Sequence, residues 1–159
     1  MARGEEYFTT VIRIFPDYAE SVIWFAIGPV SYNDAKISSQ LRSDMEAWED
    51  FYYAAQTEDF RWRRPEGREW FNAEGRRLAE RLAGEVGSRF EVEVRVYRNK
   101  KVRVNSKAEP TNPEAAEAFE TIARELREFE ERIERETRAG SNFRWFAYGP
   151  AEDPDGKPR

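Results

Sequence analysis

The most regular pattern of apolar and polar positions lies around residue 90. From residue 89 to residue 97 every second side chain is apolar, and most of those between them are charged. This period of two residues predicts a strand with one buried face, and residues 101–105 continue it after a short break. The two segments are therefore expected to form an antiparallel hairpin.

The apolar face of this hairpin restricts how its strands can pair. A three-residue loop at 98–100 pairs Val96 with Val102 and keeps the valines on one face. The same register places Arg95 opposite Arg103, which is unfavourable unless an acidic side chain lies near. A loop with an odd number of residues is therefore predicted.

Aromatic and β-branched residues also fill three other short segments. Residues 6–15 and 21–27 predict two strands joined as a hairpin, and residues 142–148 predict a last strand. The hexapeptides WFAIGP at 24–29 and WFAYGP at 145–150 nearly repeat each other, although their neighbours differ. We interpret both as strands that are apolar on two faces, where a small alanine lets a helix approach closely.

Three longer segments have the three-and-four spacing of an amphipathic helix. They are residues 38–56, 68–87 and 111–140. Ser38 is a suitable N-cap for the first helix, and Gly87 is a suitable end for the second. The apolar stripe of the first helix consists of Ile37, Leu41, Met45, Trp48, Tyr52 and Ala55.

The order of the predicted elements is β-β-α-α-β-β-α-β, which favours an α+β fold. We expect a mostly antiparallel sheet of about five strands, with three helices packed largely on one face. Residues 1–150 are expected to form a single α+β domain, and residues 151–159 a disordered tail. If all three helices cover one face, the other face carries an aromatic patch that marks an interface. If the helices divide between the two faces, both faces are covered and no such aromatic patch is left exposed.

Composition narrows the chemistry that the chain can perform. Its 159 residues carry a net charge of −5 and include no cysteine and no histidine. Thiolate and imidazole groups are thus missing, both for catalysis and as metal ligands. We expect no catalytic residues, no metal site and no cofactor. The acidic charge argues against nucleic acid as a partner, because nucleic acid is a polyanion.

Targeting signals are not evident in the sequence. The first ten residues, MARGEEYFTT, lack the apolar core of a signal peptide. No stretch approaches the roughly 20 apolar residues that a bilayer-spanning helix needs. The expected location is the cytoplasm, with no membrane partner.

Two clusters of charged residues keep other functions open. The 60–68 segment interleaves aromatic rings with four arginines, Arg61, Arg63, Arg64 and Arg68. Such a segment can stack bases and hold phosphates, although a solvated loop neutralised by nearby acids is the favoured interpretation. Glutamates and arginines also share one face of the 91–103 hairpin. That face could serve a metal-dependent enzyme, but a charged outer strand face is favoured.

A third cluster points to a protein partner. The predicted helix over 38–56 is acidic on its outer side and carries large aromatic rings. Such a surface can attract a basic protein and anchor it with aromatic side chains, whereas the alternative is a solvated helix face. The candidate partner-binding residues are Trp48, Tyr53 and Trp62, with Asp44, Glu49 and Asp50 as a charged rim.

A family resemblance covers residues 37–94. The pattern is a helix, a second helix with GRxLAxxL, and a strand, carried by Leu41, Trp48, Tyr52, Trp70, Gly75, Arg76, Leu78, Leu82 and Gly87. The segment resembles a group of small uncharacterised bacterial single-domain proteins, some of which are immunity or antitoxin-like. The resemblance implies a protein partner. It carries over no catalytic residues, because the matched residues are core and cap types.

These observations predict a non-enzymatic protein-binding module, an immunity or antitoxin-like inhibitor that acts by occluding its partner. One alternative is a nucleic-acid-acting or metal-dependent enzyme that uses the 91–103 face or the 60–68 loop. A second alternative is a structural protein that self-associates, for example as a homodimer, through aromatic surface.

Overall fold

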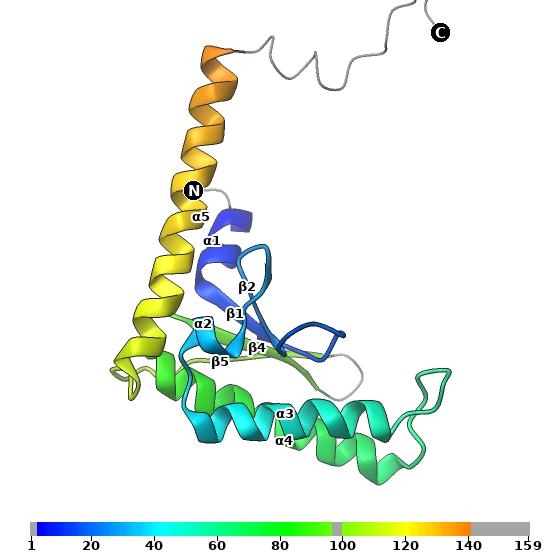
Figure 1. Ribbon diagram of the computed structural model, residues 1–159. Coiled ribbons are helices and arrows are strands. Elements are labelled where there is room, and N and C mark those ends of the chain that lie inside the picture. The colour runs from blue at the N-terminus through cyan, green and yellow to red at the C-terminus, as the bar shows by residue number, and fades with distance from the viewer. Residues whose placement is uncertain (1–2, 97–99, 141–159) are drawn as a thin grey trace, which may run out of the picture. The chain divides into compact units, whose positions relative to one another are not determined.

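The computed structural model describes residues 3–96 and 100–140, and the side chains from Glu6 onward (Figure 1). The elements are α1 (Arg3–Thr10), β1 (Val11–Ile14), β2 (Ile23–Phe25), β3 (Gly28–Pro29), α2 (Tyr32–Ala35), α3 (Ser39–Ala54), α4 (Pro65–Val86), β4 (Glu91–Val96), β5 (Lys100–Val104) and α5 (Pro113–Ala139). The predicted α+β class is confirmed. Among the described residues there are five helices rather than three, because α1 and the single turn α2 were not predicted.

The five strands form one sheet in the order β3-β2-β1-β4-β5. All neighbours are antiparallel except β1 and β4, which are parallel and lie at the centre. The prediction of a mostly antiparallel sheet of about five strands is therefore confirmed. The parallel pair aligns Ile12 with Val92 and Ile14 with Val94, so both strands end at the same edge of the sheet.

The β4–β5 pair corrects the predicted register. Three residues separate the strands, as expected, but they are residues 97–99 rather than 98–100. Val102 consequently pairs with Val94, and Arg103 lies opposite Glu93 instead of Arg95. The observed register keeps the valines on one face and adds an attractive pair, Glu93 with Arg103, although Arg95 still faces a cation, Lys101.

The N-terminal prediction was partly wrong. Residues 6–10 belong to α1, where the Thr10 hydroxyl donates to the Glu6 carbonyl at 2.6 Å, and only residues 11–14 form the strand. The hexapeptide at 24–29 does not continue as a strand. It folds back at Ala26, whose φ is 54°, so that Phe25 pairs with Gly28. The second hexapeptide, the strand predicted at 142–148 and the tail at 151–159 lie outside the described residues.

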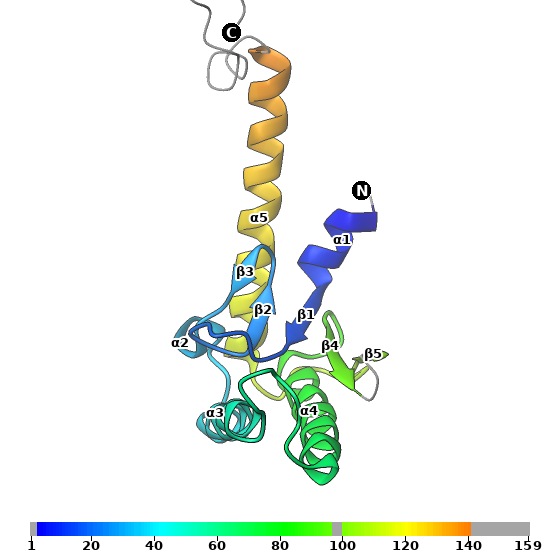
Figure 2. The ribbon, with the colours of Figure 1, turned by 90° about the vertical axis from the view of Figure 1, so that its right-hand side faces the viewer.

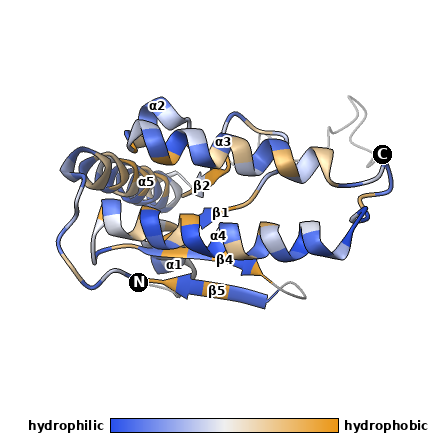
Figure 3. Cartoon of the chain, turned by 90° about the horizontal axis from the view of Figure 1, so that it is seen from below, coloured by the Kyte–Doolittle hydropathy of each residue, from blue (hydrophilic) through white to orange (hydrophobic). Residues whose placement is uncertain are grey.

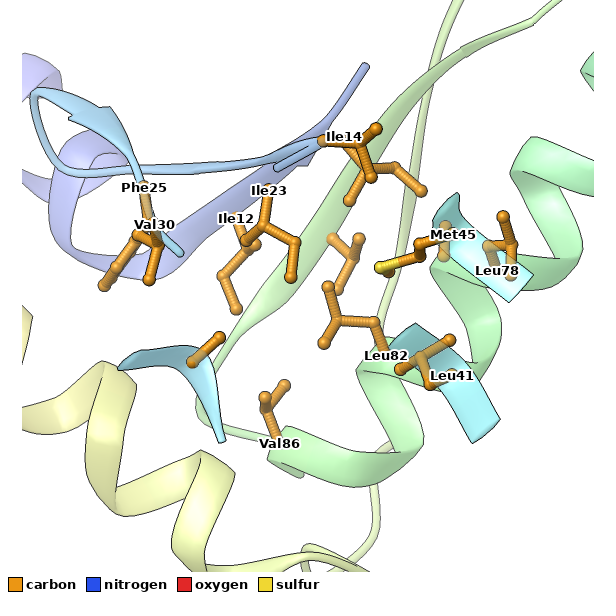
Figure 4. Close-up of a cluster of buried hydrophobic side chains, with 14 of the residues drawn as sticks. Ile12, Ile14, Ile23, Phe25, Val30, Leu41, Met45, Leu78, Leu82 and Val86 are labelled. Atoms are coloured by element: carbon orange, nitrogen blue, oxygen red, sulfur yellow. The ribbon is translucent and has the colours of Figure 1, made fainter. Parts of the chain in front are cut away.

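The core lies between one face of the sheet and α3 with α4 (Figure 4). Ile12 and Ile14 of β1 face Met45 of α3 and Leu82 of α4 in one buried cluster. Helices α3 and α4 run side by side, with apolar and hydrophilic residues alternating along both (Figure 3). Gly75 on α4 makes this possible, since a Cβ there would lie 2.8 Å from the Trp48 ring.

A buried carboxylate fixes where three segments meet. Glu85 near the end of α4 is only 8% exposed. It accepts hydrogen bonds from the Ser38 amide at 2.8 Å, the Ser38 hydroxyl at 2.6 Å and the Asn112 amide at 2.9 Å. Ser38 caps α3 as predicted, since its hydroxyl also accepts from the Leu41 amide. Glu85 thus joins α4 to the first turn of α3 and to the residue preceding α5.

The opposite face of the sheet is partly covered by α1. Tyr7 of α1 donates a hydrogen bond to Glu93 of β4 at 3.1 Å, and Arg13 of β1 lies over the Tyr7 ring. Because alternate strand residues point to opposite faces, this is the face away from the apolar core. The helix on this face is thus the unpredicted α1, whereas the predicted helices α3 and α4 and the first turns of α5 contribute to the one core on the other face.

Helix α5 crosses the boundary between two compact units, the first ending at Arg124 and the second beginning at Glu125. In the first unit, Phe119 packs against Phe25 and Phe90. In the second, the described residues continue α5 to Ala139. A single domain over residues 1–150 stays a prediction. No helix in the described ranges is long and apolar enough to cross a membrane.

Candidate functional site

Two aromatic residues and three acids form a surface on the outer side of α3 and the β1–β2 connection. We call Asp17, Tyr18, Glu49, Asp50 and Tyr53 the acidic tyrosine face. Tyr18 and Tyr53 stack with ring centroids 4.5 Å apart, and the Tyr53 hydroxyl accepts a hydrogen bond from the Tyr18 amide at 2.7 Å. Tyr18 has a left-handed φ of 48° and is 72% exposed, so the connection holds a large ring out in solvent.

Glu49 is the unusual group on this face. Its Oε2 atom is buried and has no hydrogen-bond partner among the described residues. Desolvation raises the pKa of Glu49, and the nearby charges of Asp50 and Glu46 raise it further. A hydrogen bond from the Tyr53 side chain lowers this pKa and so opposes the shift. Arg42 pairs with Glu46 at 2.8 Å. The surface therefore holds a partly buried carboxylate that a cation from outside could neutralise.

The other predicted rim residue, Asp44, lies on a different side of α3. Its carboxylate binds Arg81 and lies 3.8 Å from Arg77, both on α4. The hydrogen bond from Arg81 is the largest of the effects that lower the pKa of Asp44. This carboxylate already holds α3 to α4, so the structure does not bring it together with Glu49.

Trp48 lies in the interior between α3 and α4. It is 1% exposed, its indole donates to the Phe71 carbonyl at 2.9 Å, and the two rings stack. Of the six predicted partner-binding residues, the structure brings together Glu49, Asp50 and Tyr53. Trp48 and Trp62 line a separate groove, described next.

An aromatic groove of about 710 Å³ lies where the parallel strands β1 and β4 end, between α3 and α4. Figure 2 faces these strand ends and both helices. The aromatic groove is lined by four rings, Trp48, Tyr52, Trp62 and Phe71, with Tyr52 and Trp62 centred 5.1 and 5.3 Å from Phe71. A concave apolar site with a few polar groups is the usual form of a binding site.

Polar groups stand at defined points of the aromatic groove. Gln56 and Asn72 contribute amides, Arg68 and Arg95 contribute cations, and Asp17 contributes an acid. Sequence reasoning missed Gln56 and Asn72, because nothing in a single sequence marks an amide side chain as lining a groove. It also assigned Arg95 only to a strand face. No signal in the sequence marks the groove, because its position depends on the parallel pairing of β1 with β4, which only the structure shows; ligands often bind at the carboxyl ends of parallel strands.

The four arginines of the 60–68 segment do not converge. The segment is a closed loop, with Thr57 and Arg63 amides donating to the Arg61 and Ala55 carbonyls at 2.7 and 3.0 Å. Arg61, Arg63 and Arg64 are exposed. Arg68 lines the aromatic groove, whereas Arg63 and Arg64 border a second hollow of about 450 Å³ beside Phe51 and Trp70.

The charged face of the 91–103 hairpin is internally paired. Glu93 is 5% exposed, and its two oxygens accept from Tyr7 at 3.1 Å and from Arg103 at 3.0 Å. Burial and the Glu93 charge raise the pKa of Tyr7. Within residues 3–96 and 100–140 no group of three acidic side chains is placed to hold a metal ion.

A comparison with protein families gives a match to the central part of the chain. A family model described as Serratia CdiI immunity protein-like matches residues 10–97. This range is more than half of the chain, and it includes the acidic tyrosine face and all the described residues that line the aromatic groove. No curated protein matches the chain.

Proposed function

The chain belongs to the Serratia CdiI immunity protein-like family, and from this premise we propose that it neutralises a protein toxin. It acts without catalysis, by binding the toxin and covering the surface that the toxin needs. A cytoplasmic location, where the toxin would exert its effect, is part of this proposal.

The observation that carries the proposal is that the acids of the acidic tyrosine face have no arginine or lysine partner among the described residues. Elsewhere on α3 and α4 the acids Asp44, Glu46 and Glu74 have arginine partners. Glu49 instead keeps a buried oxygen without a partner in the described part of the chain, beside two stacked tyrosines. Tyrosines next to desolvated charges are typical of the residues that dominate protein interfaces.

The charge of this face indicates the nature of the partner. A basic surface of the toxin would supply a lysine or arginine to Glu49 and relieve the cost of its desolvation. The protein's net charge of −5 would also speed the encounter with a basic toxin. Affinity should therefore fall as salt is raised, mainly through slower association.

The test needs a candidate toxin domain, to be sought among the genes that flank the gene for this chain. Producing the chain together with that domain should restore growth of cells that the toxin alone arrests, and calorimetry should show direct binding. The double variant Glu49→Gln/Asp50→Asn should bind about tenfold more weakly or worse. The matched control Glu114→Gln/Glu117→Gln, an equal charge change on exposed α5 residues, should bind like the unchanged protein within about twofold.

Two results would contradict the proposal. Growth arrest that persists although the chain is produced in excess means that the chain does not neutralise this toxin. Protection by a protein that shows no physical binding to the toxin excludes occlusion as the mechanism.

A further inference from the structure

Strand β5 is the last strand on one side of the sheet, beyond β4 (Figure 3). It pairs with β4 alone, and no backbone hydrogen bond joins its other edge to a described residue. An extended backbone with free N–H and C=O groups is a template on which another extended chain can pair. The edge of β5 is therefore a surface that a strand of a partner could use.

The apolar face of the sheet is incompletely covered at this edge. Val92 and Val94 of β4 are 0% and 2% exposed. Their cross-strand partners, Val104 and Val102 of β5, lie on the same face but are only partly buried. A further strand with apolar side chains beside Val102 and Val104 would complete the burial of this row.

The other face of the same edge is cationic. Arg95 and Lys101 lie opposite each other on β4 and β5, and both are exposed without an ion pair to any described residue. Arg103 is already paired with Glu93. Because like charges directly opposite each other destabilise a hairpin, an acid on an adjoining strand would stabilise this one. The charge is also opposite to the net charge of the whole protein, which is −5.

These charges argue against a second copy of the chain at the edge. Two β5 strands paired antiparallel about Val102 would place Lys101 against Arg103, and a parallel pair would place Lys101 beside Lys101. Lysines on edge strands commonly discourage self-pairing in this way. The same cations attract a strand that carries acidic side chains.

From these observations we propose that β5 pairs with an extended segment of the toxin in which acidic and apolar side chains alternate. The apolar side chains lie beside Val102 and Val104, and the acids lie beside Lys101 and Arg103 on the other face. The toxin segment would thereby extend the sheet beyond β5. This inference rests on the proposed function, and it adds a contact opposite in charge to the one at the acidic tyrosine face.

Lys101→Glu in the full chain tests the role of charge, with the toxin domain used above as the partner. The new glutamate faces Arg95, so thermal stability should stay equal or rise while toxin affinity falls about tenfold or more. Arg124→Glu, an equal charge change at an exposed residue of α5, is the matched control and should change affinity less than about twofold. Unchanged affinity of Lys101→Glu would overturn the proposal.

Amide hydrogen exchange, followed by nuclear magnetic resonance in the toxin complex, tests the strand pairing itself. Every second amide of β5, those that do not bond to β4, should exchange about tenfold more slowly than in the free protein, or more slowly still. Unchanged exchange in the complex would overturn the proposal. Protection that arises in the free protein as its concentration is raised would also overturn it, because a second copy would then occupy the edge.

The proposed function would survive each of these results as long as the unchanged protein binds and neutralises the toxin. Absence of any binding by the unchanged protein would contradict both the proposed function and the pairing at β5.

Discussion

Glu85 and Glu49 are both glutamates with buried oxygens on the helical layer, but their surroundings differ. Glu85 accepts three hydrogen bonds from Ser38 and Asn112, which tie separate elements together. Glu49 has a buried oxygen without a partner among the described residues, and its neighbours Asp50 and Glu46 repel its charge. The first carboxylate stabilises the fold, whereas the second lowers stability and is the one that a partner could satisfy.

The largest effect is expected for Glu85→Ala. Three donors, two on Ser38 and one on Asn112, would lose a charged acceptor that is itself buried, so the free energy of unfolding should fall by about 3 kcal/mol. Urea denaturation at pH 7 measures this loss. Glu80→Ala, on the exposed side of the same helix, should change the value by less than about 0.5 kcal/mol. A loss below about 1 kcal/mol for Glu85→Ala would show that the comparison assigns this carboxylate too large a role.

Two glycines of α4 give the next test. An alanine Cβ at Gly75 would lie 2.8 Å from the Trp48 ring and 3.3 Å from Val94, so Gly75→Ala should cost about 2 kcal/mol through overpacking. A Cβ at Gly84 meets nothing within 4 Å, so Gly84→Ala should instead raise stability by about 0.5–1 kcal/mol through helix propensity. The midpoint temperature of thermal unfolding should therefore fall for Gly75→Ala and rise for Gly84→Ala.

A smaller effect is expected for Asp44→Asn, which removes the paired acid on α3. The loss should be about 0.5–1 kcal/mol at pH 7. Because the pKa of Asp44 in the folded protein lies below its ordinary 3.8, the stability that this carboxylate contributes is fully present above that value. It should vanish as the pH falls from about 4 through the lowered pKa. Chemical denaturation across that range checks the sign, and toxin affinity at pH 7 should stay unchanged, in contrast to variants of the acidic tyrosine face.

Local signals in the sequence were reliable where one residue determines the outcome. Ser38 caps α3 through its own hydroxyl, and Gly87 ends α4 with a positive φ of 81°. Register and partner choice depend on residues far away in the chain. The sequence could not show that Arg103 lies opposite Glu93, nor that β1 pairs in parallel with β4, because both follow from how the whole sheet assembles.

The candidate site shows the same limit. Asp44 and Glu49 are five residues apart on α3 and so point about 140° away from each other. Both are acidic positions outside the apolar stripe, and only the position of the α4 arginines separates the paired acid from the unpaired one. Tyr18 and Gln56 lie in segments that connect helices and strands. The spacing of apolar residues predicts helices and strands, but it does not predict the backbone path of such connections.

The single variant Glu49→Gln tests the central claim most directly, through stability and affinity measured on one protein. The pKa of Glu49 is raised above its ordinary 4.5, so its charge lowers stability as the pH rises through and above that value. At pH 7 Glu49→Gln should therefore unfold at a slightly higher temperature than the unchanged protein and yet bind the toxin about tenfold more weakly. A variant that is less stable, or that binds the toxin with undiminished affinity, would contradict the account.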